Sequence, residues 1–169
     1  MVRGLLPLVL FFASSVFAQN SLSSHVSLIK EIMPNSTRVA ILFKAGDSAV
    51  EAAIQKTSTD NGLMVVRVPV NSIREIAPAM RNLQSFDVDF VYLVEDRIVT
   101  GTNSIKFVVK QTVKKGIPVF TSAENAFKGG ACGQLVGEGG GLLLKINGKV
   151  SSRFELKIPE GSGKIKIEE

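Results

Sequence analysis

Residues 89–124 read DFVYLVEDRIVTGTNSIKFVVKQTVKKGIPVFTSAE, and this stretch decides the fold. Its middle carries apolar residues at spacings of three and four on one face and lysines on the other, which is typical of a helix packed on a sheet. Gly116 follows the lysine-rich last turn as a helix stop, and Pro118 prevents the helix from continuing. Continuous apolar runs flank the helix, as expected for parallel strands buried on both faces. We therefore expect a β-α-β unit with a strand over residues 90–94, a polar loop over 95–103, a helix over 104–115 and a strand over 117–120.

The chain before this unit repeats the same alternation of helix and strand. Asp47 or Ser48 is a suitable N-cap for a helix, because its side-chain oxygen can accept from the first free backbone N–H groups. The asparagine–glycine pair at residues 61–62 provides the left-handed conformation in which helices often end. The expected elements are a helix from about residue 21 to 33, a strand over 38–43, a helix over 49–60 and a strand over 63–68.

Pro78 complicates the next helical stretch. Ser72 and Glu75 have the spacing of a capping box, which places the start of this helix at Ser72 and its end at Leu83. A proline inside a helix removes a hydrogen bond, so we expect either a kink or a start delayed to residue 76 or 77. The complete order of alternating helices and strands predicts an α/β fold, a three-layer α-β-α sandwich with a mainly parallel open sheet.

The C-terminal part has a different pattern. After a short helix over residues 123–128 and a strand over 131–136, Asn147 and Gly148 stand between two apolar segments. An Asn-Gly pair in that position predicts a C-terminal β-hairpin, formed by residues 142–146 and 150–158. A helix over residues 142–145 is the alternative that these residues leave open.

Residues 1–18 have the features of a cleaved export signal. Arg3 is followed by an apolar core and by the small-residue cleavage pattern at residues 16–18. The alternative, an uncleaved membrane anchor, is disfavoured because the apolar run is shorter than the roughly 20 residues that a span needs. We therefore expect a periplasmic or otherwise exported protein. Residues 19–159 are then a single α/β lobe, and the glycine- and charge-rich residues 160–169 a flexible tail.

Charge and chemistry-bearing residues argue against several function classes. The chain has 20 Lys and Arg against 15 Asp and Glu, a net charge of +5, without a long basic run, so we expect no nucleic-acid partner. Cys132 is the single cysteine, which excludes an internal disulfide and predicts a buried small hydrophobe. His25 is the single histidine, and we interpret it as a surface or half-buried helix residue. It lies far in sequence from Cys132, so neither a Cys-His nucleophile nor a histidine-based metal site is expected.

The glycines within residues 137–141 superficially resemble a phosphate-binding loop. They lack the following lysine and serine or threonine, and they come late in the chain, so we interpret them as a connector. No enzyme motif is present, and we expect no catalytic activity, no metal and no cofactor.

Polar side chains follow three of the expected strands at their carboxyl ends. Open α/β sheets bind ligands at that edge, so together these side chains make a rim suited to a small polar ligand. Each one taken singly is also an ordinary cap or solvated loop residue. Glu95 and Asp96 are also candidates for an acid-base pair or a cation site, but Arg97 beside them favours a charge-compensated loop. The expected ligand-binding residues are Lys44, Asp47, Ser48, Glu95, Asp96, Arg97, Thr121, Ser122 and Glu124.

From residue 27 to about residue 159 the chain resembles the second half of exported substrate-binding proteins of ABC import systems, in the branch that includes tryptophan and tyrosine binders. The matching pieces are LIKEIMPNSTRVAILF, AGDSAVEAAIQKTSTDNGL, the stretch over residues 89–124, KGGACGQL and LKIPEG. The resemblance implies one lobe of a type I periplasmic binding fold, which closes with a first lobe over an amino acid or similar molecule. Carried over by position, it implicates Asp47, Ser48, Glu95, Asp96, Thr121 and Ser122.

The chain departs from this family in two places. The first lobe is missing between the expected signal and residue 27, and GEGGGLLLKINGKVSSRFELKIP replaces the usual helix and return segment. We therefore expect an exported single-lobe module that binds or senses a small polar molecule such as an amino acid. A membrane permease, a sensor, a second lobe or a second copy facing the first are the candidate partners. The alternative is a periplasmic interaction or regulatory protein without a ligand, since residues 154–159 also resemble small periplasmic repressors of cyclic-di-GMP synthesis.

Overall fold

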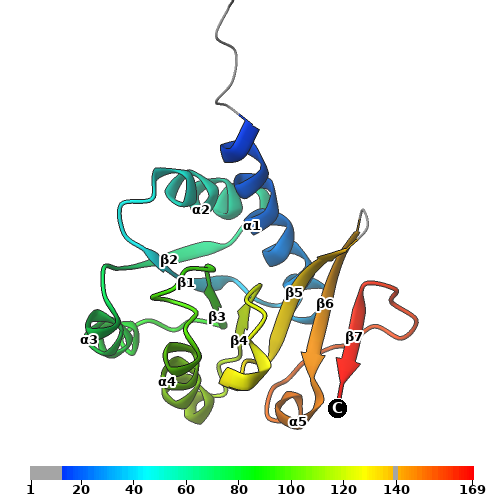
Figure 1. The fold of residues 1–169 in the computed structure, drawn as a ribbon. Coiled ribbons are helices and arrows are strands. Elements are labelled where there is room, and N and C mark those ends of the chain that lie inside the picture. The colour runs from blue at the N-terminus through cyan, green and yellow to red at the C-terminus, as the bar shows by residue number, and fades with distance from the viewer. Residues whose placement is uncertain (1–12, 139–140) are drawn as a thin grey trace, which may run out of the picture.

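The computed structural model describes residues 13–138 and 141–169. They form a seven-stranded sheet in the order β2-β1-β3-β4-β5-β6-β7, with helices on both sides (Figure 1). Strands β1 to β5 are parallel, β6 is antiparallel to β5, and β7 is parallel to β6. The expected α/β sandwich with a mainly parallel sheet is confirmed.

The elements are α1 (Ala13–Ile32), β1 (Arg38–Lys44), α2 (Ser48–Asn61), β2 (Met64–Val70), α3 (Ile73–Leu83), β3 (Phe90–Leu93), α4 (Thr102–Thr112), the 3-10 helix η1 (Val113–Lys115), β4 (Val119–Thr121), the 3-10 helix η2 (Phe127–Gly129), β5 (Gly133–Glu138), β6 (Gly141–Asn147), α5 (Gly148–Ser151) and β7 (Ile165–Glu168).

Strand β1 shows how both faces of the sheet are covered. Val39, Ile41 and Phe43 belong to the apolar cluster that includes α1 and α2. Ala40 and Leu42, which alternate with them, belong to the cluster on the α3 and α4 side. Figure 1 shows the two helix pairs on opposite sides of the sheet. Because successive side chains of a strand point to opposite faces, a strand between two helix layers is apolar throughout.

The ends of α2 are those that the sequence predicts. The Asp47 carboxylate accepts from the backbone N–H groups of Ala49 and Val50, each at 3.1 Å. At the other end Gly62 has a φ of 60°, a left-handed conformation that glycine adopts without a steric penalty. These caps place α2 between the carboxyl end of β1 and the amino end of β2.

Helix α3 begins at Ile73 and continues through Pro78, so the start delayed to residue 76 or 77 is wrong. Ser72 makes no hydrogen bond to the helix backbone, but its hydroxyl donates to Glu75, which also accepts from the Asn71 backbone N–H at 2.9 Å. Pro78 lies on the exposed side of the helix. The carbonyl that loses its partner there can be hydrated, which explains why the helix tolerates the proline.

Helix α1 starts earlier than expected, at Ala13, and therefore continues across the expected cleavage point after Ala18. The first 12 residues of the expected export signal lie outside the described residues. No helix within residues 13–138 and 141–169 combines the length and apolar character that a membrane crossing needs.

The C-terminal β-hairpin is present, but its strands and turn are not the ones that we expected. It joins β5 to β6, with Glu138 paired to Gly141; residues 139–140 between the two strands lie outside the described residues. Residues 142–145 are in strand β6, so the alternative of a helix there is wrong. Asn147 and Gly148 begin α5 instead of a turn, because the Asn147 side chain accepts from the Lys149 N–H at 3.2 Å as an N-cap.

Residues 152–158 run as an irregular segment beside the end of α1 and are not a strand. The backbone N–H of Lys157 donates to the Ile32 carbonyl at 2.8 Å. Phe154, Leu156 and Ile158 pack against the cluster on the α1 side. Their alternation therefore reflects one buried face of an extended segment and not pairing in a sheet. Beyond it, β7 lies within the range that we expected to be a flexible tail.

Candidate ligand-binding site at the carboxyl ends of the strands

Strands β1, β3 and β4 end together at one edge of the sheet. Leu93 of β3 is paired with β1 on one side and with β4 on the other. One or two residues further along each strand, Lys44, Glu95 and Ser122 follow at this edge. Three groups of different character, a cation, a carboxylate and a hydroxyl, are thus placed by the register of parallel strands.

A hydrogen bond joins the loops that follow β3 and β4. The Ser122 hydroxyl donates to the Glu95 carboxylate at 3.1 Å. Glu95 is exposed and Ser122 is partly buried, so the carboxylate stays open to solvent while one of its oxygens is held. The two loops are consequently linked by a polar contact at the rim where a ligand was expected.

Tyr92 and His25 continue this contact into the protein. The Tyr92 side chain lies on the α1 side of β3 with 2 % of its surface exposed, and its hydroxyl is 2.6 Å from Nδ1 of His25. The Ser122 hydroxyl also interacts with Tyr92, and this contact lowers the pKa of the phenol against a larger rise caused by burial. The two rings lie with centroids 5.9 Å apart at an interplanar angle of 42°. Helix α1, the centre of the sheet and the rim are therefore connected through four side chains, which we call the polar chain: His25, Tyr92, Ser122 and Glu95.

Hydrogen-bond direction is fixed at the exposed end of the polar chain. A carboxylate only accepts, so the single hydroxyl proton of Ser122 is given to Glu95. At the inner end, the Tyr92 hydroxyl donates to Nδ1 of His25 when the imidazole proton is on Nε2 and accepts from it when the proton is on Nδ1.

Burial keeps the inner groups of the polar chain uncharged. It lowers the pKa of His25 from 6.5 to about 4. Burial also raises the pKa of Tyr92 well above its usual value of 10.0; the Ser122 hydrogen bond opposes this shift and the Glu95 charge adds to it. At neutral pH the polar chain therefore consists of two neutral rings, a hydroxyl and one exposed carboxylate.

Several other predicted site residues are held by their own loops. Asp47 is the N-cap of α2, with Ser48 as the first helical residue. The Asp96 carboxylate accepts from the Ile98 N–H at 2.8 Å, and the buried Thr121 hydroxyl accepts from the Ala123 N–H at 3.2 Å. These contacts correspond to the alternative that such residues are caps and loop residues. The remaining members are exposed at this edge: Lys44, Arg97 and Glu124.

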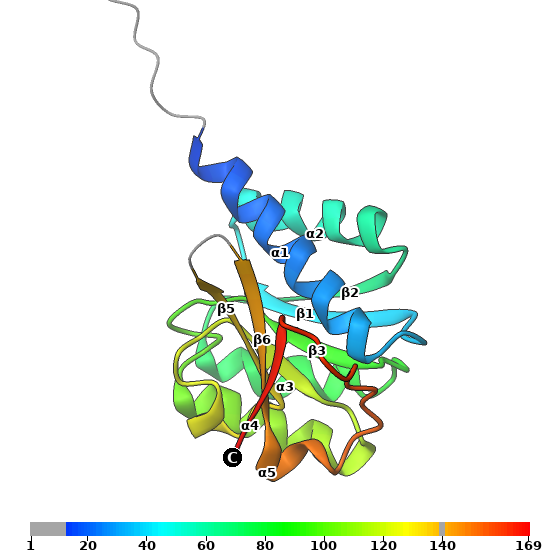
Figure 2. The ribbon, with the colours of Figure 1, turned by 90° about the vertical axis from the view of Figure 1, so that its right-hand side faces the viewer.

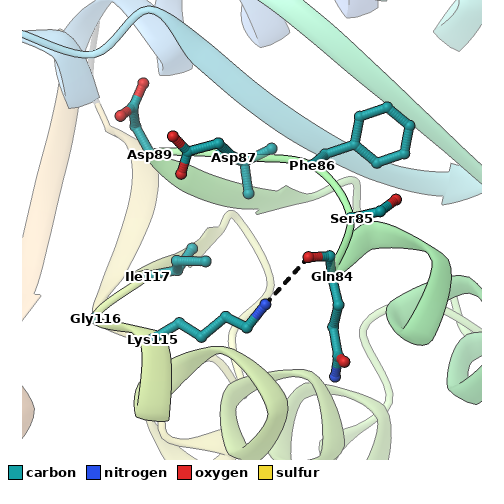
Figure 3. A pocket seen from close by; sticks show the side chains of 9 residues that line it. Gln84, Ser85, Phe86, Asp87, Asp89, Lys115, Gly116 and Ile117 are labelled. Atoms are coloured by element: carbon teal, nitrogen blue, oxygen red, sulfur yellow. Dashed lines mark hydrogen bonds between the residues drawn. The ribbon is translucent and has the colours of Figure 1, made fainter.

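Open cavities occur at the opposite, amino end of the strands. One of about 420 Å³ lies between the segments that precede β3 and β4, and its lining includes Asp87, Asp89 and Lys115 (Figure 3). Lys115 donates to the Gln84 carbonyl there at 3.2 Å. A neighbouring cavity of about 590 Å³ extends from Lys115 to Phe154. The sequence reasoning placed no candidate residue at this end.

The remaining chemistry-bearing groups provide no second centre among the described residues. Cys132 is buried, and burial raises its thiol pKa to about 12, as expected for a small hydrophobe. Within residues 13–138 and 141–169 no three His, Cys, Asp or Glu side chains gather closely enough to hold a metal ion.

Sequence reasoning missed the roles of His25 and Tyr92 in this site. His25 shares a helix face with Ile29 and Ile32, at spacings of four and seven, and that face is buried. Tyr92 is the single tyrosine of the chain and stands in an apolar strand. A hydroxyl in a buried strand needs a hydrogen-bond partner, and this need was the available signal.

A single α/β lobe with polar groups at the carboxyl ends of parallel strands is the architecture of ligand-binding proteins of the periplasmic type. The family model described as ABC transporter substrate binding protein matches residues 14–138. The chain belongs to this family, and the resemblance seen in the sequence is confirmed.

Solved structures support the same fold assignment. The crystal structure of a conserved domain protein from Vibrio cholerae has a TM-score of 0.69 at 19 % identity, covering 86 % of this chain and 60 % of that one. An ABC domain from Streptococcus pneumonia, solved in complex with L-Trp, has a TM-score of 0.70 at 18 % identity, with coverages of 85 % and 60 %. A ligand-free, open substrate binding protein with adhesive properties from Clostridium difficile gives 0.66 at 15 % identity, with coverages of 85 % and 58 %.

The chain thus spans about three fifths of the length of these solved relatives. No curated protein matches its sequence.

Proposed function

We propose that this protein is an exported, single-lobe module that binds a small zwitterionic molecule, such as an amino acid, at the carboxyl ends of β1, β3 and β4. Membership of the substrate-binding family supports ligand binding in general. The observation that carries the finer proposal is the Ser122–Glu95 hydrogen bond at 3.1 Å, which fixes an exposed carboxylate at the rim.

The charges at this edge are complementary to a zwitterion. Glu95 would accept from the ammonium group of the ligand, and Lys44 would bind its carboxylate. Lys44 is exposed and forms no ion pair with any described residue, so its charge is free for a ligand. Hydrogen bonds between charged partners are about twice as strong as neutral ones, which favours an ionic ligand over a neutral one.

Tyr92 and His25 have a positioning role in this proposal. The Ser122 hydroxyl interacts with Tyr92 and donates to Glu95 at 3.1 Å, so it is already oriented toward Glu95 before a ligand arrives. Preorganised polar groups bind more tightly, since less conformational freedom is lost on binding. We infer that buried side chains of the sheet and α1 hold the exposed groups of the ligand site in position.

Export and partners complete the proposal. Residues 1–18 would direct the chain out of the cytoplasm, and the ligand-loaded lobe would then contact a membrane permease, a sensor or a second lobe. We propose no catalytic step, because the polar chain contains no activated nucleophile and presents a single carboxylate.

Thermal unfolding of the chain from Gln19 onward, with a panel of amino acids, nucleobases and small anions, tests the ligand proposal. A compound at about 100 times its Kd should raise the midpoint by roughly 5–10 °C, because it binds the folded state only. Glu95→Gln and Ser122→Ala should reduce this shift for amino acids. Folding of each variant is checked by its midpoint without ligand.

Two lysines at opposite ends of the strands form a matched control pair. Lys44→Gln should weaken amino-acid binding, and Lys115→Gln, which changes another exposed lysine at the amino end, should leave it unchanged. Loss of the shift in Lys115→Gln alone would instead place the ligand in the amino-end cavities. A well-folded protein with no shift for any compound would refute the ligand proposal.

A protein-docking role is the second candidate, and one observation favours it. Phe86 lies at the edge of the amino-end cavity with 49 % of its surface exposed (Figure 3). Phe86 adjoins a small hollow that is also lined by Met80, Leu83 and Ile117, and contiguous apolar surface of this kind marks protein–protein contacts. Pull-down of a specific periplasmic partner that is lost in Phe86→Ser, with no ligand shift, would favour this role over the first.

A further inference from the structure

The two edge strands of the sheet, β2 and β7, differ in whether another strand could pair with their outward backbone groups. In β2, Met64 donates to the Thr37 carbonyl and Val70 accepts from Ala45, so even-numbered residues face β1. Odd-numbered residues direct their backbone groups outward, and Pro69 is one of them. A proline at such a position has no outward N–H, which prevents another strand from pairing there.

Strand β7 has no such protection on its outer side. Lys164 accepts from the Leu144 N–H at 2.8 Å, so Lys166 and Glu168 also direct their backbone groups toward β6. Ile165, Ile167 and Glu169 consequently present free N–H and C=O groups outward. Figure 2 looks onto this side of the molecule, and β7 lies in front of β6.

Two side chains of β7 also lack a partner within the described chain: an exposed isoleucine and a lysine without an ion pair. Ile165 is 7 % exposed, whereas Ile167, on the same face, is 56 % exposed. On the other face Glu168 pairs with Lys145 at 2.8 Å, while Lys166 has no ion pair with any described residue. The strand therefore offers backbone groups, an apolar side chain and an unpaired cation.

We propose that β7 pairs in antiparallel orientation with β7 of a second copy of this chain, with Ile167 opposite Ile167 of the other copy. An antiparallel pair about a two-fold axis must be centred on a residue whose backbone points outward or on the gap between two such residues. Centring on Ile167 lets both copies exchange N–H···O bonds at this residue and between Ile165 and Glu169. The two Ile167 side chains then cover each other on one face.

The same register pairs opposite charges on the other face. With Ile167 at the axis, Lys166 of one copy lies opposite Glu168 of the other, in a non-hydrogen-bonded pair where side chains approach closely. Each Lys166 thereby gains the carboxylate that it lacks in the single chain. A second copy fits because three features select the same register: the outward direction of the Ile167 backbone groups, the contact between the two Ile167 side chains, and the opposite charges of Lys166 and Glu168.

Sedimentation equilibrium of the purified protein over a range of concentrations tests the dimer. The expected result is a reversible transition from the mass of one chain to twice that mass. Ile167→Pro introduces at β7 the device that β2 has at Pro69, since only an outward N–H is lost. It should raise the dimer dissociation constant by at least about tenfold without removing a hydrogen bond to β6.

A charge exchange tests the register independently. Lys166→Glu places two carboxylates opposite each other and should weaken the dimer, and Lys166→Glu combined with Glu168→Lys should restore it. In the wild type, a carbodiimide should cross-link Lys166 to Glu168 between isotopically distinct copies. A protein that stays monomeric at all concentrations, whether the edge is free or takes a strand of another protein, would overturn the proposal, as would a dimer unaffected by Ile167→Pro.

Discussion

The polar side chains at the carboxyl ends of the central strands are arranged differently from those at the amino ends. At the carboxyl end, His25, Tyr92 and Ser122 lead from the interior to one exposed carboxylate, and each group has its partner within the polar chain. At the amino end, Asp89 caps the start of β1 while Asp87 and Lys115 surround an open cavity. At the carboxyl end, hydrogen bonds hold the polar side chains in place. At the amino end, polar side chains line open cavities and make fewer such bonds.

This difference separates two criteria for a ligand site, the size of a cavity and the organisation of the polar groups beside it. An organised polar group has already lost the freedom that binding would otherwise remove, whereas an exposed lysine beside a cavity has not. The carboxyl end should therefore be sensitive to small chemical changes, and the amino end should be sensitive only where a side chain caps the backbone.

The largest effect that separates the two ends is expected from pH. The pKa of His25 is about 4 in the folded protein and 6.5 in the unfolded chain, so the unfolded state binds the proton first as the pH falls. This contribution to stability is complete above pH 6.5 and is lost as the pH falls toward 4. The free energy of unfolding should decrease by about 3 kcal/mol over this window.

Urea unfolding at a series of pH values measures this decrease. His25→Asn keeps an amide near the position of Nδ1 that can donate or accept but does not titrate, so its curve should be flatter by the amount assigned to His25. Carboxylates with lowered pKa values, such as Asp60 and Glu75, contribute equally to both proteins and cancel in the difference. Parallel curves for the two proteins would show that His25 titrates normally.

The next largest effect is expected at the amino end. Asp89 accepts from the backbone N–H groups of Thr37 and Arg38 at 2.7 and 2.8 Å, which ties the start of β3 to the start of β1. Asp89→Ala should lower the free energy of unfolding by about 2 kcal/mol, because two donors lose a charged acceptor. Asp87→Ala, which removes an exposed carboxylate without a hydrogen bond among the described residues, is the matched control. Similar losses in both variants would contradict this assignment.

A smaller effect is expected from the hydroxyl of Tyr92. Tyr92→Phe keeps the ring in the apolar cluster but removes the group between His25 and Ser122, which should cost about 1–2 kcal/mol in unfolding free energy. Combined with Ser122→Ala, the loss should be smaller than the sum of the two single losses. Strict additivity in chemical unfolding would mean that the two hydroxyls act independently.

The smallest effect is expected for Lys115, which is exposed and donates one hydrogen bond to the Gln84 carbonyl. Lys115→Met should change the free energy of unfolding by less than about 0.5 kcal/mol, since water replaces the ammonium group as donor. Differential scanning calorimetry of this variant sets the baseline for the other three. A loss comparable to that of Asp89→Ala would mean that the amino end is more organised than its contacts indicate.

Local signals in the sequence predicted most of the parallel sheet. The apolar runs of β1 and β3 are long enough to require burial on both faces, and Asp47 and Gly62 define the ends of α2 through contacts within a few residues. These features depend on neighbouring residues alone, so no knowledge of the tertiary structure was needed.

The C-terminal part was harder because its structure depends on distant partners. Phe154 and Leu156 alternate as strand residues do, but they pack against α1 from outside the sheet. Strand β7 forms because it pairs with the edge of β6. Its four residues alternate between isoleucine and a charged residue, and so short a pattern does not predict a strand by itself. Among the predicted site residues, Glu95 and Ser122 are brought together at the carboxyl ends of the strands. The inner half of the polar chain was not predicted, because a buried histidine–tyrosine contact joins residues 67 positions apart.

Cys132 gives the protein a built-in reporter of its own opening. Cys132 precedes β5, is 1 % exposed and belongs to the apolar cluster on the α1 side, so this cluster must open before a reagent reaches the thiol. With a pKa of about 12 it is also unreactive while it stays enclosed. The rate of labelling by an aromatic disulfide therefore measures, without any added probe, how often the centre of this lobe comes apart.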